Sequence, residues 1–333
     1  MEIVPAVGER PLRIVLPGGS GQVGQVLARH FQERSHHVTV LTRGPYAAEW
    51  QTVHWDGKEP GDWIDTLEGA DVCINLAGRS VNCRYSADNR AAIYNSRIGT
   101  TRLLNRVIAG LAEPPRVWLN ASTATIYRHA LDREMDEATG ELGGEELVSR
   151  TRRAPETWNF SIRVAKDWEA AFFAGETQRT RKVAMRSALI FSPEPGTAFG
   201  TLSNLARLGL GGRQGNGRQF VSWIHESDFA RAVEFLIEHE ELSGPVNIAA
   251  PHPLPNRAFM AALREAWGRP NGLPIPSLPI EIGAFFLRTE SELVLKSRRV
   301  VPRRLLDAGF EFEFPEWPEA ADDLVSQWRH RND

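Results

Sequence analysis

The residues that decide the fold lie near the start of the chain: Arg13-Ile14-Val15-Leu16-Pro17-Gly18-Gly19-Ser20-Gly21-Gln22-Val23-Gly24. The apolar run at 13–16 predicts a buried strand, and residues 22–34 predict a helix. Glycines at such a join allow a tight turn, an approach of backbone N–H groups to a pyrophosphate, and close helix–strand packing. The helix N-terminus adds a favourable field for an anion. We therefore interpret 18–24 as a dinucleotide-binding turn, with a purely structural glycine turn as the alternative.

The end of the second predicted strand indicates which dinucleotide is bound. An acidic residue at this place would bond the ribose 2′-hydroxyl of NAD. Strand 38–41 is followed instead by Thr42 and Arg43. Because an arginine can pair with a 2′-phosphate, we expect NADP(H) to be preferred over NAD(H). Contacts to the adenine, ribose and pyrophosphate are expected from Trp55, Asp56, Asn75, Leu76, Ala77 and Gly78.

Strands and helices alternate through the first half of the chain. After the opening unit, strands are predicted at 72–76, 117–119 and 183–191, and helices at 86–110 and 160–174. This alternation is typical of an α/β fold with a doubly wound parallel sheet of the Rossmann type. We expect the Rossmann domain to span 12–192, with 222–250 returning to it. A smaller C-terminal α/β lobe on the substrate side is expected from 193–221 and 251–333.

Composition narrows the classes of partner. The formal net charge of −3 at pH 7 offers no general basic field for nucleic acid or anionic lipid. Two cysteines are too few for a disulfide framework or a cysteine-based zinc site, and no metal site is expected. No apolar run approaches the length of a membrane span, so we expect a cytoplasmic protein with no membrane partner.

Several motifs together resemble the atypical extended short-chain dehydrogenases/reductases known as epimerase-family proteins. They occur in chain order from the glycine turn: Asn75-Leu76-Ala77-Gly78, Ser96-Arg97-Ile98-Gly99-Thr100-Thr101, Ser122-Thr123-Ala124-Thr125-Ile126-Tyr127, Trp223-Ile224-His225 and Val301-Pro302-Arg303-Arg304-Leu305-Leu306. The resemblance runs from about residue 12 to 325. It implies an NADP-binding Rossmann domain, a small C-terminal domain of unknown function, and cofactor contacts at Thr42, Arg43, Leu76, Ala77, Arg97 and Leu189.

The usual catalytic pair of short-chain dehydrogenases is absent from this sequence. That mechanism needs a tyrosine to exchange a proton with the substrate and a lysine four residues later to lower its pKa. Alignment on Trp168-Glu169 puts Ser161 and Ala165 at those two positions. Ser122 and Thr123 remain as candidates to orient the substrate oxygen. Tyr127 is a candidate proton donor, with a packed aromatic as the alternative.

Candidate substrate contacts come from two regions. Arg218 could clamp an anionic or sugar-like group and Trp223 could stack on a ring, while Arg84 lies in a loop that faces the pocket in such folds. The long loop at 140–157 could cover the pocket or be a surface insertion. The leading hypothesis is an NADP(H)-dependent oxidoreductase or epimerase acting on a small, sugar-derived molecule, with a homodimer as one allowed assembly. The alternative is a regulator or scaffold that binds NADP(H) without turnover.

Overall fold

The computed structural model describes residues 10–45, 48–144, 154–194, 196–276 and 292–332. Its centre is a parallel sheet of seven strands in the spatial order β10-β6-β5-β4-β1-β2-β3. The strands are β1 Arg13–Pro17, β2 His37–Thr42, β3 Gln51–His54, β4 Val72–Asn75, β5 Val117–Thr123, β6 Arg181–Ser187 and β10 Gly244–Ile248. The order 3-2-1-4-5-6 is that of the Rossmann fold, and β10 extends it at one edge.

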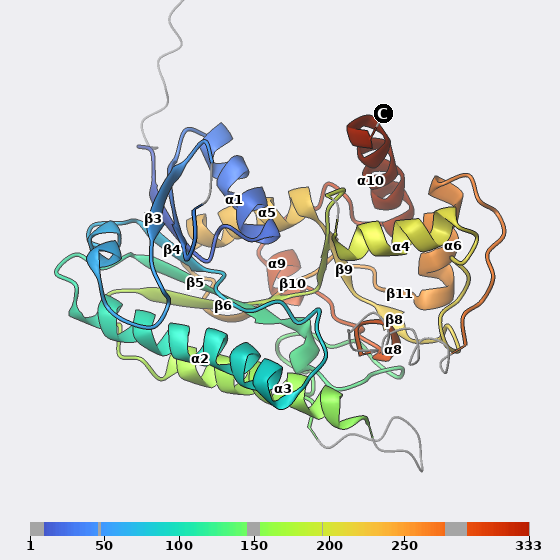
Figure 1. Ribbon diagram of the computed structural model, residues 1–333, viewed down its shortest axis with the longest axis horizontal. Helices are drawn as coiled ribbons and strands as arrows, with labels where there is room; N and C mark the ends of the chain where they lie inside the picture. The colour runs from blue at the N-terminus through green and yellow to red at the C-terminus, as the bar shows by residue number, and fades with distance from the viewer. Residues whose placement is uncertain (1–9, 46–47, 145–153, 195, 277–291, 333) are drawn as a thin grey trace, which may run out of the picture.

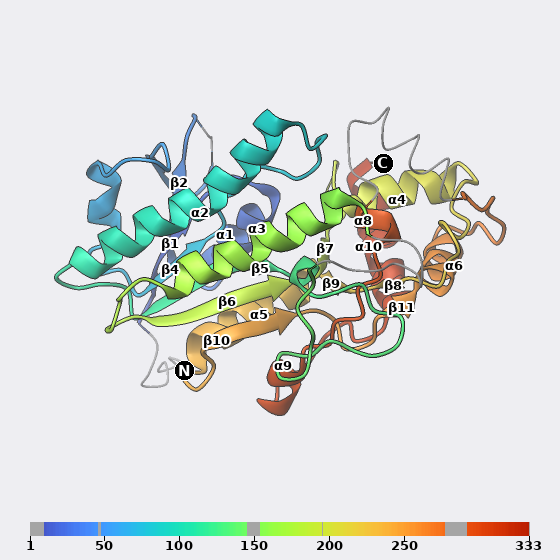
Figure 2. The ribbon, with the colours of Figure 1, turned by 90° about the horizontal axis from the view of Figure 1, so that it is seen from below.

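Helices cover both faces of this sheet (Figures 1 and 2). One face carries α1 Gln22–Glu33 and α5 Glu226–Glu238, and the other carries α2 Ala87–Gly110 and α3 Glu156–Phe173. The alternation along β1 explains the two layers, since Ile14 and Leu16 pack with the first helix pair whereas Val15 packs with the second. The doubly wound parallel sheet expected from the sequence is confirmed.

The strand predicted over 183–191 is in fact two strands in two sheets. After β6 ends at Ser187, β7 Leu189–Phe191 leaves the main sheet and pairs in parallel with β9 Trp223–His225. Ala188 is the break, and its N–H is donated to the carbonyl of Ile248 on β10. A continuous apolar run therefore predicted the buried strand but not the change of partner. The helix predicted from 160 begins four residues earlier, at Glu156.

A smaller lobe lies beyond the carboxyl ends of the sheet strands (Figure 1). It contains α4 Ala198–Arg207, β8 Phe220–Val221, β11 Leu254–Pro255, α6 Asn256–Ala266, α8 Glu292–Leu295 and α10 Trp317–Asn332. Although it falls within the range expected for the lobe, α9 Arg303–Asp307 packs against β10 of the main sheet. Strands β8 and β11 pair antiparallel. The lobe has its own aromatic core, in which the rings of Phe259 and Trp317 stack at 4.0 Å. Short 3₁₀ turns, η1 Asp62–Thr66 and η2 Ala124–Ile126, complete the described elements.

Candidate active site

The glycine turn between β1 and α1 is tight at two points and open at a third. Gly18 has a φ of +77°, and a Cβ there would lie 2.7 Å from Cα of Ala77. A Cβ on Gly24 would lie 2.3 Å from the carbonyl oxygen of Gly19, so the helix packs directly on the turn. At Gly21 the nearest atom to a built Cβ is 3.7 Å away. Gly18 and Gly24 are thus required by packing, whereas Gly21 leaves space above the N-terminus of the helix.

The N-terminus of α1 is suited to an anion. Gly21 is its N-cap with extended backbone, no side chain caps the first turn, and that turn contains no acidic residue. The first N–H groups of a helix have no partner within the helix and carry the positive end of its dipole. The space beside Gly21 is where a pyrophosphate can accept hydrogen bonds from them. The residues present therefore fit a dinucleotide phosphate.

The ends of β2 and β3 provide the residues expected around the adenosine half. Thr42 Oγ1 donates to Ser20 Oγ at 3.2 Å, which ties the end of β2 to the glycine turn. The next residue, Arg43, is exposed at that edge. Trp55 is buried and packs edge-on against Trp63, so it belongs to the core below this region. The exposed Asp56 accepts backbone N–H groups of its own turn, Glu59 first and then Lys58, which hold its pKa below the usual value.

The turn after β4 forms the next part of the wall. Asn75 is fully buried; its Oδ1 accepts the N–H of Ala77 at 3.1 Å and its Nδ2 donates to Asn120 at 2.7 Å. These bonds shape the Leu76-Ala77-Gly78 segment that approaches Gly18. Arg97 of α2 lies over the face of Trp168 at 5.2 Å and donates to the carbonyl of Arg79 at 2.9 Å. The residues expected to bind the cofactor, from β1, β4 and α2, therefore lie together at the carboxyl ends of the sheet strands.

A cavity of about 410 Å³ opens next to this edge. Val23, Leu76, Gly78 and Arg97 line its cofactor side, together with Leu189 of β7. Other parts of the wall come from the loop before α2, from the end of β5 and η2, from α3 and from the C-terminal lobe: Tyr85, Ser122, Thr123, Thr125, Phe160, Ser161, Ala165, Trp168, Glu292 and Arg298. One continuous space thus extends from Val23, beside the glycine turn, to the positions of the missing tyrosine and lysine.

Of the three residues expected to take part in catalysis, two line the cavity. Ser122 Oγ donates its hydrogen to Glu169 Oε1 at 2.6 Å, so it is left to act as an acceptor. Thr123 Oγ1 accepts the N–H of Thr125 at 3.1 Å and can still donate its own hydrogen.

The third residue, Tyr127, does not line the cavity. Its ring is 1% exposed, and its hydroxyl accepts from Arg186 and donates to Asn247 at 2.9 Å each. Burial, only partly offset by Arg186, raises the pKa of this phenol. The packed alternative considered for Tyr127 is the arrangement that the structure shows.

The residues expected to contact substrate lie elsewhere. Trp223 is fully buried and packs edge-on against Trp317 at 5.0 Å, so the expectation that it stacks on a substrate ring does not hold. β9 directs this side chain into the aromatic core of the lobe. Arg218 is exposed in the turn that begins at Asn216 and is not part of the cavity wall. Arg84 is exposed too, but the loop that contains it does face the cavity through its neighbour Tyr85.

Sequence reasoning missed several polar residues of the cavity, among them Tyr85 and Glu292. Tyr85 has no lysine four residues later, and no local motif surrounds Glu292, which comes from the C-terminal lobe. Both meet at Ser161: its hydroxyl donates to Glu292 Oε2 at 2.6 Å and lies 3.3 Å from the phenol oxygen of Tyr85. The sequence did offer one indication: Ser161 is smaller than the tyrosine expected at its position, and this leaves room for side chains from other segments.

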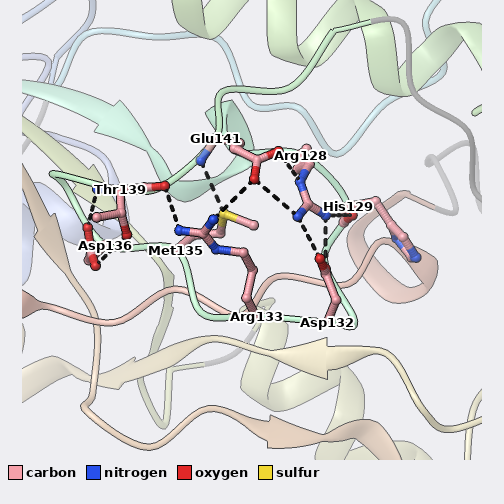
Figure 3. Close-up of polar contacts among 8 residues, drawn as sticks. All are labelled: Arg128, His129, Asp132, Arg133, Met135, Asp136, Thr139 and Glu141. Atoms are coloured by element: carbon pink, nitrogen blue, oxygen red, sulfur yellow. Dashed lines mark hydrogen bonds and ion pairs between the residues drawn. The ribbon is translucent and has the colours of Figure 1, made fainter.

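The segment from Arg128 to Glu141, which leads into the expected long loop at 140–157, is held by charged side chains (Figure 3). Arg128 pairs with Asp132 and with Glu141 at 2.8 Å each, and Arg133 reaches the same Glu141. The backbone of Met135 exchanges hydrogen bonds with the Arg299–Val301 segment of the lobe. The segment 128–141 therefore fastens the Rossmann domain to the C-terminal lobe. The central part of the expected insertion, 145–153, lies outside the described residues.

The fold and the glycine turn define a dinucleotide-binding protein of the Rossmann class. The model of the NAD dependent epimerase/dehydratase family matches residues 14–249, and a domain of unknown function, DUF1731, matches residues 275–324. The chain belongs to the NAD dependent epimerase/dehydratase family.

Individual relatives agree with this assignment. The chain is 32% identical to the epimerase family protein SDR39U1 of Bos taurus, over 95% of this chain and 100% of that protein. The crystal structure of human SDR39U1 (isoform 2) with NADPH superposes with a TM-score of 0.80 at 29% identity, covering 94% and 99% of the two chains. UDP-N-acetylglucosamine 4-epimerase of Bacillus cereus shares the fold, with a TM-score of 0.71 at 17% identity and coverage of 96% and 99%.

Within the described ranges, no helix has the length and apolar character needed to cross a membrane.

Proposed function

We propose that this protein is an NADP(H)-dependent oxidoreductase or epimerase that acts on a small, sugar-derived substrate. The observation that carries the proposal is the cavity that extends from Val23, at the start of α1 beside the glycine turn, to Thr123 and Ser161. The adenosine half of the cofactor would lie along Thr42 and Arg43, and the pyrophosphate would lie over the N-terminus of α1. The relative crystallised with NADPH supports this choice of cofactor.

Each polar side chain of the cavity would have its own role in the reaction. When bound, the nicotinamide would supply or take up a hydride. Thr123, whose hydroxyl keeps a hydrogen to donate, would orient the substrate oxygen. Ser122 would act only as an acceptor because its hydroxyl already donates its hydrogen bond to Glu169. The apolar rings of Phe160 and Trp168 line the same space and would exclude water from the reacting atoms.

Bound NADPH provides a direct test. The protein is loaded with NADPH and mixed with a panel of aldehydes, ketones and nucleotide sugars while the fluorescence of the bound cofactor is followed. We expect loss of the signal with at least one carbonyl compound, slowed when the transferred hydrogen of NADPH is replaced by deuterium. Constant fluorescence with the whole panel would favour the alternative, a scaffold that binds NADP(H) without turnover, for which the absent tyrosine–lysine pair is the supporting observation.

A pair of threonine variants shows whether the reaction takes place in this cavity. Thr123→Val should slow the oxidation of bound NADPH by roughly fivefold to a hundredfold, since a neutral hydrogen bond contributes about 1 kcal/mol and one to a charged group about 1.5–3 kcal/mol. Thr177→Val is the matched control: this threonine is buried outside the cavity, and its hydroxyl has no hydrogen-bond partner among the described residues. Equal rates for both variants would place the chemistry elsewhere.

A further inference from the structure

A carboxylate from the C-terminal lobe reaches the position that the catalytic tyrosine has vacated. Ser161 stands at that position on α3, and its hydroxyl donates to Glu292 Oε2 at 2.6 Å. The phenol oxygen of Tyr85, from the loop before α2, is 3.3 Å from Ser161 Oγ. All three side chains line the cavity. Three separate segments of the chain thus converge on one point of the wall.

The hydrogen bonds in this group have a direction. A serine hydroxyl has one hydrogen and two lone pairs. Because Ser161 gives its hydrogen to Glu292, the phenol of Tyr85 must be the donor at the Tyr85–Ser161 contact. Donation therefore runs from Tyr85 to Ser161 to Glu292 and ends on a carboxylate. The second lone pair of Ser161 remains able to accept a hydroxyl from the cavity.

The charge on Glu292 is compensated within the same short segment. Its side chain is 3% exposed, and a carboxylate so far from water is costly unless it is paired. Arg298 Nη2 lies 3.4 Å from Oε1 and Lys296 Nζ lies 3.9 Å from it. Lys296 is itself fully buried and also donates to the carbonyl of Thr125 at the end of β5.

A histidine packed against this segment is neutral. His129 accepts the N–H of Ser297 through Nδ1, and burial, followed by the charges of Lys296 and Arg298, lowers its pKa to about 4. His129 is therefore uncharged at neutral pH and does not compete with Glu292 for the two cations.

We propose that the C-terminal lobe supplies the proton-holding group of the active site, with Glu292 as acid–base residue and Ser161 as the hydroxyl that touches the substrate oxygen. This inference rests on the proposed function and gives the lobe a role in it. During alcohol oxidation the substrate O–H bond breaks and its proton passes to Ser161 Oγ, while the hydrogen of Ser161 passes to Glu292 Oε2. The C–H electron pair would pass with its hydrogen, as hydride, to the oxidised nicotinamide that the proposed function supplies, and the carbonyl forms. Reduction returns the same proton by the same route.

The competing explanation is that the ion pairs of Glu292 have a purely structural role. The chain contains another ion pair in the same segment that can serve for comparison. Arg299 of the same segment pairs with Glu134 at 3.3 Å, but both side chains are partly exposed and neither lines the cavity. Glu134→Gln is therefore the matched control for Glu292→Gln, because both variants neutralise a carboxylate that holds this segment to the Rossmann domain.

The first readout is the rate of hydride transfer from bound NADPH to the substrate found by the panel. Glu292→Gln should slow it by roughly 10²- to 10⁴-fold, the usual contribution of a general acid or base, and should remove one limb of the pH–rate profile. NADPH affinity should stay unchanged. Ser161→Ala should show the same loss and serves as a second variant if Glu292→Gln fails to fold. Glu134→Gln should match the original protein.

The second readout needs no substrate. The ultraviolet absorbance change on ionisation of Tyr85 is isolated by subtracting a Tyr85→Phe titration. In Glu292→Gln this phenol should ionise at lower pH, because a negative charge that opposes the phenolate has been removed. Glu134→Gln should leave the Tyr85 titration where it was.

The two readouts separate the possible failures. If the original protein transfers hydride and Glu292→Gln does so equally fast with the same pH profile, the role of Glu292 is overturned while the proposed function stands. If the original protein binds NADPH but transfers hydride to no member of the panel, the proposed function falls. In that case an unchanged Tyr85 titration in Glu292→Gln also overturns the hydrogen-bonded chain, whereas a shifted one retains it.

Discussion

Gly21 and Gly24 lie three residues apart in one turn, yet they are surrounded differently. Gly24 is buried, and its Cα hydrogen faces the carbonyl of Gly19. Gly21 is exposed and has an ordinary φ of −74°, so an alanine there meets no backbone strain. The spacing of the glycines predicted both positions, but only the structure assigns packing to one and ligand approach to the other.

This difference gives opposite expectations for two alanine substitutions. Gly24→Ala should lower the free energy of unfolding by about 1–3 kcal/mol, the usual cost of overpacking. Gly21→Ala should leave that energy unchanged while it raises the Kd for NADPH about tenfold or more, because a methyl group keeps the pyrophosphate from hydrogen bonds of roughly 1.5–3 kcal/mol. Urea denaturation and fluorescence titration measure the two effects. A Gly21→Ala variant with full NADPH affinity would contradict the assignment of the phosphate to this turn.

Individual side chains show where reasoning from the sequence stops. The residue type of Trp223 suggested a stacking platform, but the direction of β9 and the presence of Trp317 bury it. Glu292 lies 131 positions from Ser161, and contacts over such separations leave no spacing in a single sequence. Patterns of glycine and apolar residues lie within short segments, so the sequence alone could predict what they form. The contacts of Trp223 with Trp317 and of Ser161 with Glu292 depend instead on how the lobe packs against the rest of the chain.

At the scale of elements, a buried charged network joins β5, α3 and β6. Glu169 of α3 accepts two hydrogen bonds from Arg186 of β6, at 2.8 and 2.7 Å, and one from Ser122 of β5 at 2.6 Å. Burial opposes the charge on Arg186, but the bonds to Glu169 outweigh it and raise the pKa of the guanidinium. This network holds Ser122 in place at the wall of the cavity.

Neutralising Glu169 should therefore destabilise the fold. Glu169→Gln should cost about 3–5 kcal/mol in the free energy of unfolding, since it leaves Arg186 as an uncompensated buried charge. Glu156→Gln on the same helix removes the ion pairs that this exposed carboxylate makes with Arg90 and Arg163, and should cost about 0–1 kcal/mol. Chemical denaturation compares them. Similar small costs for both variants would mean that the buried pair contributes little.

The order of the elements was largely predictable, but their partners were less so. Apolar runs alternating with helical periodicity predicted a parallel sheet and five of its seven strands. The same apolar character hid the break at Ala188, because β6 and β7 are both buried although they belong to different sheets. Burial determines that the residues of a strand are apolar, whereas the tertiary fold determines which other strand it pairs with.

On the scale of the whole molecule, the candidate active site lies where two parts of the chain meet. The Rossmann sheet provides the glycine turn and Thr123 at the carboxyl ends of its strands, which is where ligands bind in open α/β sheets. The lobe adds Glu292 and Arg298 to the opposite wall. The sequence predicted the cofactor half because its motifs are continuous, and it left the substrate half open because that half is assembled from distant segments.

The central claim is that this assembly binds NADP(H) through the glycine turn and Arg43, and the most direct test is the ratio of the Kd values for NADH and NADPH. We predict tighter binding of NADPH by the original protein, and a loss of roughly ten- to a hundredfold in NADPH affinity for Arg43→Asp, the equivalent of about 1.5–3 kcal/mol for hydrogen bonds to a charged group. NADH affinity should change little or improve, because an aspartate at this place can bond the ribose 2′-hydroxyl. Equal affinities for the two cofactors, before and after the substitution, would contradict the account.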